Sequence, residues 1–266
     1  MSDSSNNWLI PILLAAGAAI ALLFFWPRMN PPDVEPALVE EPPVDERPRR
    51  PGPLHPLEPL DSPRDGERKL VALPALSDSD AWFRLELLDL VGARLDALLT
   101  DEALIEKFVA TIDNLPRKHV AERIRPVGRL DGAFQVEGDP ETDAFLLARE
   151  NFQRYDFLVN MITGADIESV VDAYRRYYPL FQEAYVSLGY PDAYFNDRVV
   201  EVIDHLLATP QPAAPLRLVR PHVLYEFADP DFEALSSGQK LLLRMGPDNG
   251  ARMRETLRAL RARIAT

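Results

Sequence analysis

The apolar positions that follow residue 77 recur mainly at helical spacing. Residues 77–99 open with serines and aspartates, which cap helices well, and continue as an apolar-periodic run. In residues 166–190, apolar side chains recur three, four and seven positions apart; Pro179 interrupts this pattern, so we expect a kink or break near Tyr178. Comparable patterns predict helices over residues 101–115, 117–124, 140–164, 238–246 and 247–264, and one within 189–210.

Two other segments have the pattern of β structure. Asp131 and Gly132 lie between short β-prone runs in residues 127–136, which is the strongest local signal for a hairpin. Residues 216–230 have an extended pattern. Because two strands alone are marginally stable, the hairpin must pack on the helices. We therefore predict a single, mainly α domain over residues 77–266 with a small β-hairpin.

The chain begins with a segment that has the pattern of a membrane span. Residues 8–26 (WLIPILLAAGAAIALLFFW) carry no charge and, as a helix, would be about 28 Å long, close to the hydrocarbon core of a bilayer. The tail, residues 1–7, lacks the basic residues of a signal peptide, so we predict a retained single-pass transmembrane helix in the inner membrane. Arg28 is the only basic residue near the span and lies after it, which taken alone favours a cytoplasmic domain. Because a long domain translocates largely regardless of charge, we favour a periplasmic domain, with a cytoplasmic one as the alternative.

Residues 27–76 form a separate region that is rich in proline. They hold 13 of the 25 prolines of the chain, interleaved with acids and arginines. Proline removes backbone donors and disfavours helix in the preceding residue. The sequence therefore predicts a disordered Pro-rich linker, a stalk or simple tether with a reach of at most roughly 150 Å.

Charge and composition exclude several classes of function. The net charge is −13, and residues 77–266 contain 22 basic and 31 acidic residues without a basic patch, which argues against nucleic-acid binding. The chain has no cysteine, which excludes disulfides and thiolate chemistry. The four histidines match no metal-binding spacing, so we predict no metal and no cofactor, although carboxylates alone leave a calcium or magnesium site open.

Four long strings resemble a known family. They are FVATIDNLPR (108–117), YRRYYPLFQEAYVSLGYP (174–191), YFNDRVVEVIDHLLATP (194–210) and FADPDFEALSSGQKLLLRMGPDN (227–249). Together they resemble the bacterial, membrane-anchored proteins catalogued as domain of unknown function 3014. The resemblance implies a Gram-negative envelope protein with an N-terminal anchor. It implies no activity and supplies no functional residues.

One helical face in residues 189–210 carries the residues best suited to catalysis or metal binding. Helical geometry places an apolar stripe on one side and polar groups on the other, namely Asp197, Glu201, Asp204 and His205. Three interpretations stay open for the polar face. It is a solvated surface, a face packed against another helix or a partner, or a site in which Glu201 and His205 act as the catalytic groups.

A cluster of tyrosines and arginines offers a second candidate surface. Tyr174, Tyr178 and Tyr185 fall on the apolar stripe of residues 166–190, whereas Arg175, Arg176 and Tyr177 fall off it and could meet an acidic or sugar-rich partner. Filling of the core by tyrosines, with surface arginines paired to acids, is the alternative. The complete candidate ligand or partner surface is Arg175, Arg176, Tyr177, Tyr190, Asp197 and Arg198.

These observations support three hypotheses about function. We favour a non-enzymatic, membrane-anchored interaction module of the bacterial cell envelope, which binds the membrane through residues 8–26 and a protein partner through its domain. The first alternative is an envelope hydrolase or lyase that uses a carboxylate pair. The second is a module that binds cell-wall ligands through Tyr177, Tyr190 and Arg176.

Overall fold

A computed structural model describes residues 52–57, 72–128, 134–139, 144–213, 215–222 and 224–265. One compact unit comprises Arg50–Thr266. The N-terminal tail and the predicted span, residues 1–7 and 8–26, lie outside the described residues. No helix in the described ranges is both long enough and apolar enough to cross a membrane.

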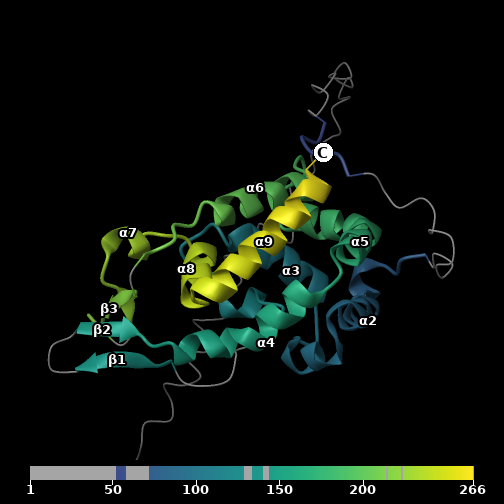
Figure 1. Cartoon of the computed structure of the whole chain (residues 1–266). Helices are drawn as coiled ribbons and strands as arrows, with labels where there is room; N and C mark the ends of the chain where they lie inside the picture. The colour runs from purple at the N-terminus through teal and green to yellow at the C-terminus, as the bar shows by residue number, and fades with distance from the viewer. Residues whose placement is uncertain are drawn as a thin grey trace, which may run out of the picture. The chain divides into compact units, whose positions relative to one another are not determined.

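Helices form most of the unit, as the apolar periodicity predicts (Figure 1). Gly92, at a φ of 99°, ends the first long helix and separates it from a 3-10 turn. In chain order the helical elements are η1 (Leu76–Asp78), α2 (Asp80–Val91), η2 (Ala93–Leu98), α3 (Leu104–Asn114), η3 (Glu122–Ile124), α4 (Glu150–Gly164), α5 (Ile167–Ser187), α6 (Phe195–Leu207), α7 (Pro230–Glu233), α8 (Ser237–Arg244) and α9 (Pro247–Ile264).

Several details of these helices differ from the sequence prediction. The run predicted as helical over 77–99 is α2 only as far as Val91. Helix α5 continues through Pro179 without a break, and the proline is exposed on its surface. The helix predicted over 117–124 is only the 3-10 turn η3.

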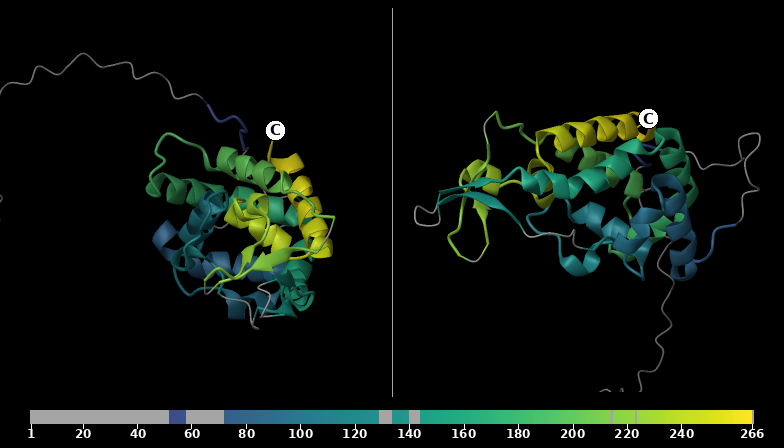
Figure 2. Two further views of the ribbon diagram at one scale, coloured as in Figure 1. Left: turned by 90° about the vertical axis from the view of Figure 1, so that its left-hand side faces the viewer. Right: turned by 60° about the horizontal axis from the view of Figure 1, so that its bottom comes forward.

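An antiparallel sheet lies at one end of the unit (Figures 1 and 2). Its strands are β1 (Val136–Asp139), β2 (Ala144–Leu147), β3 (Arg217–Val219) and β4 (Glu226–Phe227), in the order β1-β2-β3-β4. Phe145 pairs with Leu218, which in turn pairs with Phe227, and all three side chains are buried. These residues form a second apolar cluster with Leu243 of α8, which attaches the sheet to the helices.

The hairpin that the structure describes lies further along the chain than the predicted one. The expected turn at Asp131–Gly132 lies outside the described residues, and the observed hairpin pairs residues 136–139 with 144–147. Residues 144–147 are therefore a strand, although the sequence predicts a helix from residue 140, and α4 begins only at Glu150. The physical reason is tertiary: β2 gains hydrogen-bonded pairing with β3, which lies 70 or more residues later in the chain.

The main core joins α2, α3, α5, α6 and α9. Phe181 of α5 lies at its centre, with ring centroids 5.5 Å from Phe83 of α2 and 5.9 Å from Phe195 of α6. Aromatic pairs at this spacing contribute beyond their buried area. Helix α9 contacts α4, α5, α6 and α8, so the last helix of the chain holds the bundle together.

The end of the predicted linker also packs on this core. Leu57, Leu73 and Leu76 contact the main cluster, although the sequence assigns residues 27–76 to a linker without a core of its own. Leucines between prolines give no periodic signal, but each one can fill a gap in a surface that the helices have already formed. The ordered unit therefore begins before residue 77.

The polar face of α6 and a cleft beside α9

Helix α6 has the two faces that its sequence predicts. Its apolar stripe is buried, comprising Phe195, Val199, Val202, Ile203 and Leu206. The polar side chains lie on the other side, where the neighbouring elements are α3, α8, α9 and the segment 52–57. Each of the four polar residues, Asp197, Glu201, Asp204 and His205, has a hydrogen-bond partner within the protein, although Glu201 and Asp204 remain exposed.

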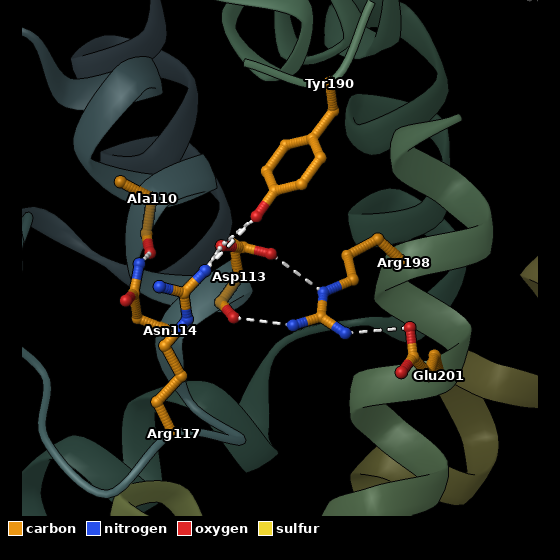
Figure 3. A network of polar contacts seen from close by, with 7 residues as sticks. All are labelled: Ala110, Asp113, Asn114, Arg117, Tyr190, Arg198 and Glu201. Atoms are coloured by element: carbon orange, nitrogen blue, oxygen red, sulfur yellow. Dashed lines mark hydrogen bonds and ion pairs between the residues drawn. The ribbon is translucent and has the colours of Figure 1, made fainter. Parts of the chain in front are cut away.

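A buried carboxylate connects α6 to α3 (Figure 3). Asp113 is 2% exposed and accepts a hydrogen bond from Nε of Arg198 at 2.9 Å. Arg198 also donates through Nη2 to the backbone oxygen of Asp113 at 2.7 Å, and through Nη1 to Glu201 at 2.8 Å. Burial disfavours the charge of Arg198, but its hydrogen bonds to Glu201 and Asp113 outweigh burial and raise its pKa.

Tyr190 and Arg117 complete this network. The second carboxylate oxygen of Asp113 accepts from Nη2 of Arg117 at 3.0 Å and from the hydroxyl of Tyr190 at 3.3 Å. The ring of Tyr190 stacks on Tyr185, with centroids 4.7 Å apart. The arrangement is an ion-pair network with its acceptors filled, so Tyr190 and Arg198 hold α3, α6 and the α5–α6 loop together. Sequence reasoning missed Asp113, because the one local indication of its ion pairs is Arg117 four positions later.

Asp197 binds the segment 52–57 rather than water. Its two carboxylate oxygens accept the backbone N–H groups of Leu54 at 3.0 Å and His55 at 2.8 Å. Beside it, Nδ2 of the buried Asn196 donates to the backbone oxygens of His55 and Ile264, both at 2.9 Å. Two adjacent polar residues of α6 thus hold a proline-flanked segment next to the C-terminal end of α9.

Glu201 and His205 take part in separate contacts. Glu201 is exposed and pairs with Arg198, whereas Nε2 of His205 lies 2.8 Å from Oγ of Ser236. Ser236 is buried and accepts the backbone N–H of Gln239 as the N-cap of α8. The hydroxyl of Ser236 therefore has a structural role at the start of α8. Asp204 binds Arg261 of α9, and this hydrogen bond lowers the pKa of Asp204.

The tyrosine and arginine cluster of α5 is divided between core and surface. Tyr177 is 3% exposed and packs against Phe83, which corrects its placement on an outer surface; burial raises its pKa to about 12. Arg176 donates to Glu86 of α2 at 3.1 Å. Arg175 is half-buried, and its Nε bonds to nothing in the described part of the chain. Among the candidate surface residues, Tyr190 and Arg198 meet at Asp113, whereas Arg176 binds α2 and Asp197 binds the segment 52–57.

A cleft of about 810 Å³ lies beside the start of α9. Side chains from β2, α4, α8 and α9 line it, and among them Arg254 is only 5% exposed. Sequence reasoning missed this cleft because its walls come from segments about 100 residues apart. Among the described residues, no three histidine, aspartate or glutamate side chains converge as a metal site requires.

Comparison with known proteins identifies the family. Neither the curated proteins nor the solved structures contain a match to this chain. The family model described as a protein of unknown function, DUF3014, matches residues 104–261. The matched range runs from the start of α3 almost to the end of α9, and so it includes the Asp113 network, the polar face of α6 and the cleft. Because the match covers more than half of the chain, the protein belongs to the DUF3014 family.

Proposed function

We propose that this protein is a non-enzymatic interaction module, anchored in the inner membrane of a bacterial cell envelope by residues 8–26, with its helical domain in the periplasm. The outer face of α2 is the surface that binds a protein partner. Helix α2 lies at the end of the unit opposite the sheet (Figures 1 and 2).

The observation that carries this proposal is an exposed apolar stripe on α2. Trp82 is 48% exposed and Leu85 is 67% exposed, three positions apart and therefore on one face of the helix. Phe83 on the opposite face is buried in the core. A helix with apolar residues on both faces is typical of one that is covered on both sides. Tryptophan is also enriched at the centres of protein interfaces.

Charge favours a protein over a lipid surface as the partner. The domain has 22 basic and 31 acidic residues, and α2 itself carries Asp80, Glu86 and Asp89 against a single Arg84. The surface of an anionic leaflet attracts basic segments and repels acidic ones. The apolar stripe is therefore better matched to an apolar patch on a protein.

The proposed acid–base alternative has less support from the geometry. Arg198 engages Glu201 within α6, and Ser236, the N-cap of α8, engages His205 and so holds α6 to α8. Replacement of Glu201 by glutamine is expected to leave any envelope phenotype unchanged.

Crosslinking of the full-length protein in intact cells tests the proposed surface. The wild type should yield a discrete crosslinked protein, and Leu85→Glu should abolish it because a charge replaces the centre of the apolar stripe. Leu224→Glu is the matched control, since Leu224 is 75% exposed and belongs to the loop between β3 and β4. Absence of any crosslinked protein at native abundance, or a product that survives Leu85→Glu, would overturn the proposal.

The compartment needs a separate measurement. A reporter that is active only in the periplasm, fused to the C-terminus of the full chain, should be active. An inactive fusion, together with an active cytoplasmic reporter, would contradict the periplasmic orientation and leave the crosslinking result as the test of the surface.

A further inference from the structure

Arg254 of α9 is a buried cation that has no counter-ion within the described ranges. Its Nε atom is inaccessible and bonds to nothing in that part of the chain. Burial lowers the pKa of Arg254, and the nearby charge of Arg258 lowers it further. A buried charge of this kind destabilises a fold unless something pairs with it. In a protein with an acidic excess, an arginine left in this position indicates a role other than stability.

The first turn of α9 lies next to this guanidinium. A Cβ atom on Gly250 would lie 3.1 Å from Nη1 of Arg254, so the absence of a side chain there lets the guanidinium approach the helix backbone. The helix begins after the N-cap Gly246 at Pro247, which has no N–H, so the donors without an intrahelical acceptor in its first turn are the backbone N–H groups of Asp248 and Asn249. The helix start adds a partial positive charge to that of Arg254.

The same cleft supplies apolar walls. Leu147 of β2, Phe152 of α4, Leu242 of α8 and Met245, the C-cap of α8, line it together with Arg254. Its volume of about 810 Å³ lies within the range of about 300–1,000 Å³ that is typical of small-molecule sites. One buried cation beside apolar walls matches a ligand with one anionic end and an apolar body.

We propose that this cleft binds a small organic carboxylate, with its carboxylate on Arg254 and the start of α9 and its apolar body against Phe152 and Leu147. The proposal is independent of the partner surface on α2. The guanidinium is suited to this role because its planar set of N–H donors matches the two oxygens of a carboxylate.

A single negative charge fits the cleft better than a double one. Asp156, Asp248 and the exposed Arg149 also line it, and Asp156 is held in place by Nδ2 of Asn249 at 2.7 Å. These carboxylates repel a second charge on the ligand. A carboxylate therefore suits the site better than a phosphate monoester, which carries close to two charges at neutral pH.

Calorimetry on the full-length protein in lipid nanodiscs tests the ligand class, with empty nanodiscs as the blank. The probes are 4-phenylbutyrate, 4-phenylbutan-1-ol and 4-phenylbutyl phosphate, which share one apolar body. We expect saturable binding of the butyrate and binding of the alcohol about tenfold to a hundredfold weaker, as the loss of a charge-assisted hydrogen bond predicts. Equal binding of the alcohol, tighter binding of the phosphate, or no saturable binding of the butyrate would overturn the proposal.

Two variants then assign the effect to Arg254. Arg254→Met should abolish butyrate binding while the melting temperature stays the same or rises, because the change removes an unpaired buried charge. Arg258→Met is the matched control: it makes the same charge change on an exposed residue one turn later and should retain binding. A lower melting temperature for Arg254→Met would show that the arginine is structural, and retained binding would exclude it from the site.

Discussion

Asp113 shows how one carboxylate can determine the arrangement of several elements. It is buried, and its two oxygens and its backbone carbonyl accept hydrogen bonds from Arg117, Tyr190 and Arg198. Removal of one member of a buried pair leaves the other charge without compensation, and that loss is larger than the net contribution of the intact pair. Loss of the Asp113 carboxylate therefore lowers stability mainly because it leaves the charge of Arg198 without compensation.

We predict that Asp113→Ala lowers the free energy of unfolding by about 2–4 kcal/mol, because Arg198 then keeps only Glu201 as a charged partner among the described residues. Denaturant unfolding followed by circular dichroism measures this loss. Glu201→Ala is the control: Glu201 is 68% exposed on its side chain, and its loss should change stability by less than about 1 kcal/mol. Similar losses for the two variants would contradict a central role for Asp113.

The buried tyrosines predict loss of stability in alkali. Burial raises the pKa of both Tyr177 and Tyr185 to about 12, from an ordinary value of 10. The folded state therefore holds these two protons more tightly than the unfolded state does. Their contribution to stability is complete below pH 10 and is lost as the pH rises from 10 towards 12.

Burial also raises the pKa of Tyr174 and Tyr178. Ultraviolet titration of tyrosinate should accordingly show four groups that ionise later than free tyrosine does. Tyr177→Phe should remove one late-titrating group and make the unfolding free energy less sensitive to alkali. Titration of every tyrosine near pH 10 in the folded protein would be inconsistent with this burial.

At the scale of elements, the junction of α8 and α9 depends on one glycine. Gly246 has a φ of 85°, and a Cβ atom there would lie 2.5 Å from Cγ in the ring of Phe152 on α4. Both the backbone conformation and the close approach of the ring therefore require glycine. The start of α9, and with it the wall of the cleft, is held against α4 by this contact.

We predict that Gly246→Ala lowers the free energy of unfolding by about 2–4 kcal/mol through backbone strain and overpacking. Thermal and denaturant unfolding measure this effect. Gly164→Ala at the end of α4 is the matched control, because a Cβ atom on Gly164 would meet no neighbouring atom within 4 Å, and its change should stay within about 1 kcal/mol. A neutral Gly246→Ala variant would show that Phe152 moves without loss of stability.

At the scale of the whole molecule, the capture of residues 52–57 changes the expected architecture. The sequence predicts that the entire region 27–76 separates the domain from the membrane, but Asp197 and Asn196 bind backbone groups of Leu54 and His55. On the proposed topology, the tether that can separate domain and bilayer then ends near residue 52. Its greatest reach is about half of that expected for the full linker.

Hydrogen exchange on the full-length protein tests this attachment. The amides of Leu54 and His55 should be protected in the wild type and exchange freely in Asp197→Ala, which removes both acceptors. Glu201→Ala, one turn further along α6, should leave the protection intact. Rapid exchange of both amides in the wild type would contradict the captured segment.

Local patterns were sufficient for most of the helices and for the buried stripe of α6. That stripe depends on residues three or four positions apart, so adjacent sequence encodes it. Tyr177 was placed wrongly because a helix in the centre of a bundle is covered on several sides, and α2 covers the side that α5 alone leaves open. A pattern within one helix contains no information about its second neighbour.

The sequence by itself determined a mainly helical domain, the ends of most helices and membership of a family. Only the tertiary structure decided where the hairpin lies, what the polar face of α6 contacts, and that Arg254 is buried in a cleft. Helical periodicity arises from hydrogen bonds between near neighbours, whereas these other features depend on pairs far apart in the chain. Asp113 and Arg198, 85 residues apart, meet because the packing of α3 against α6 brings them together.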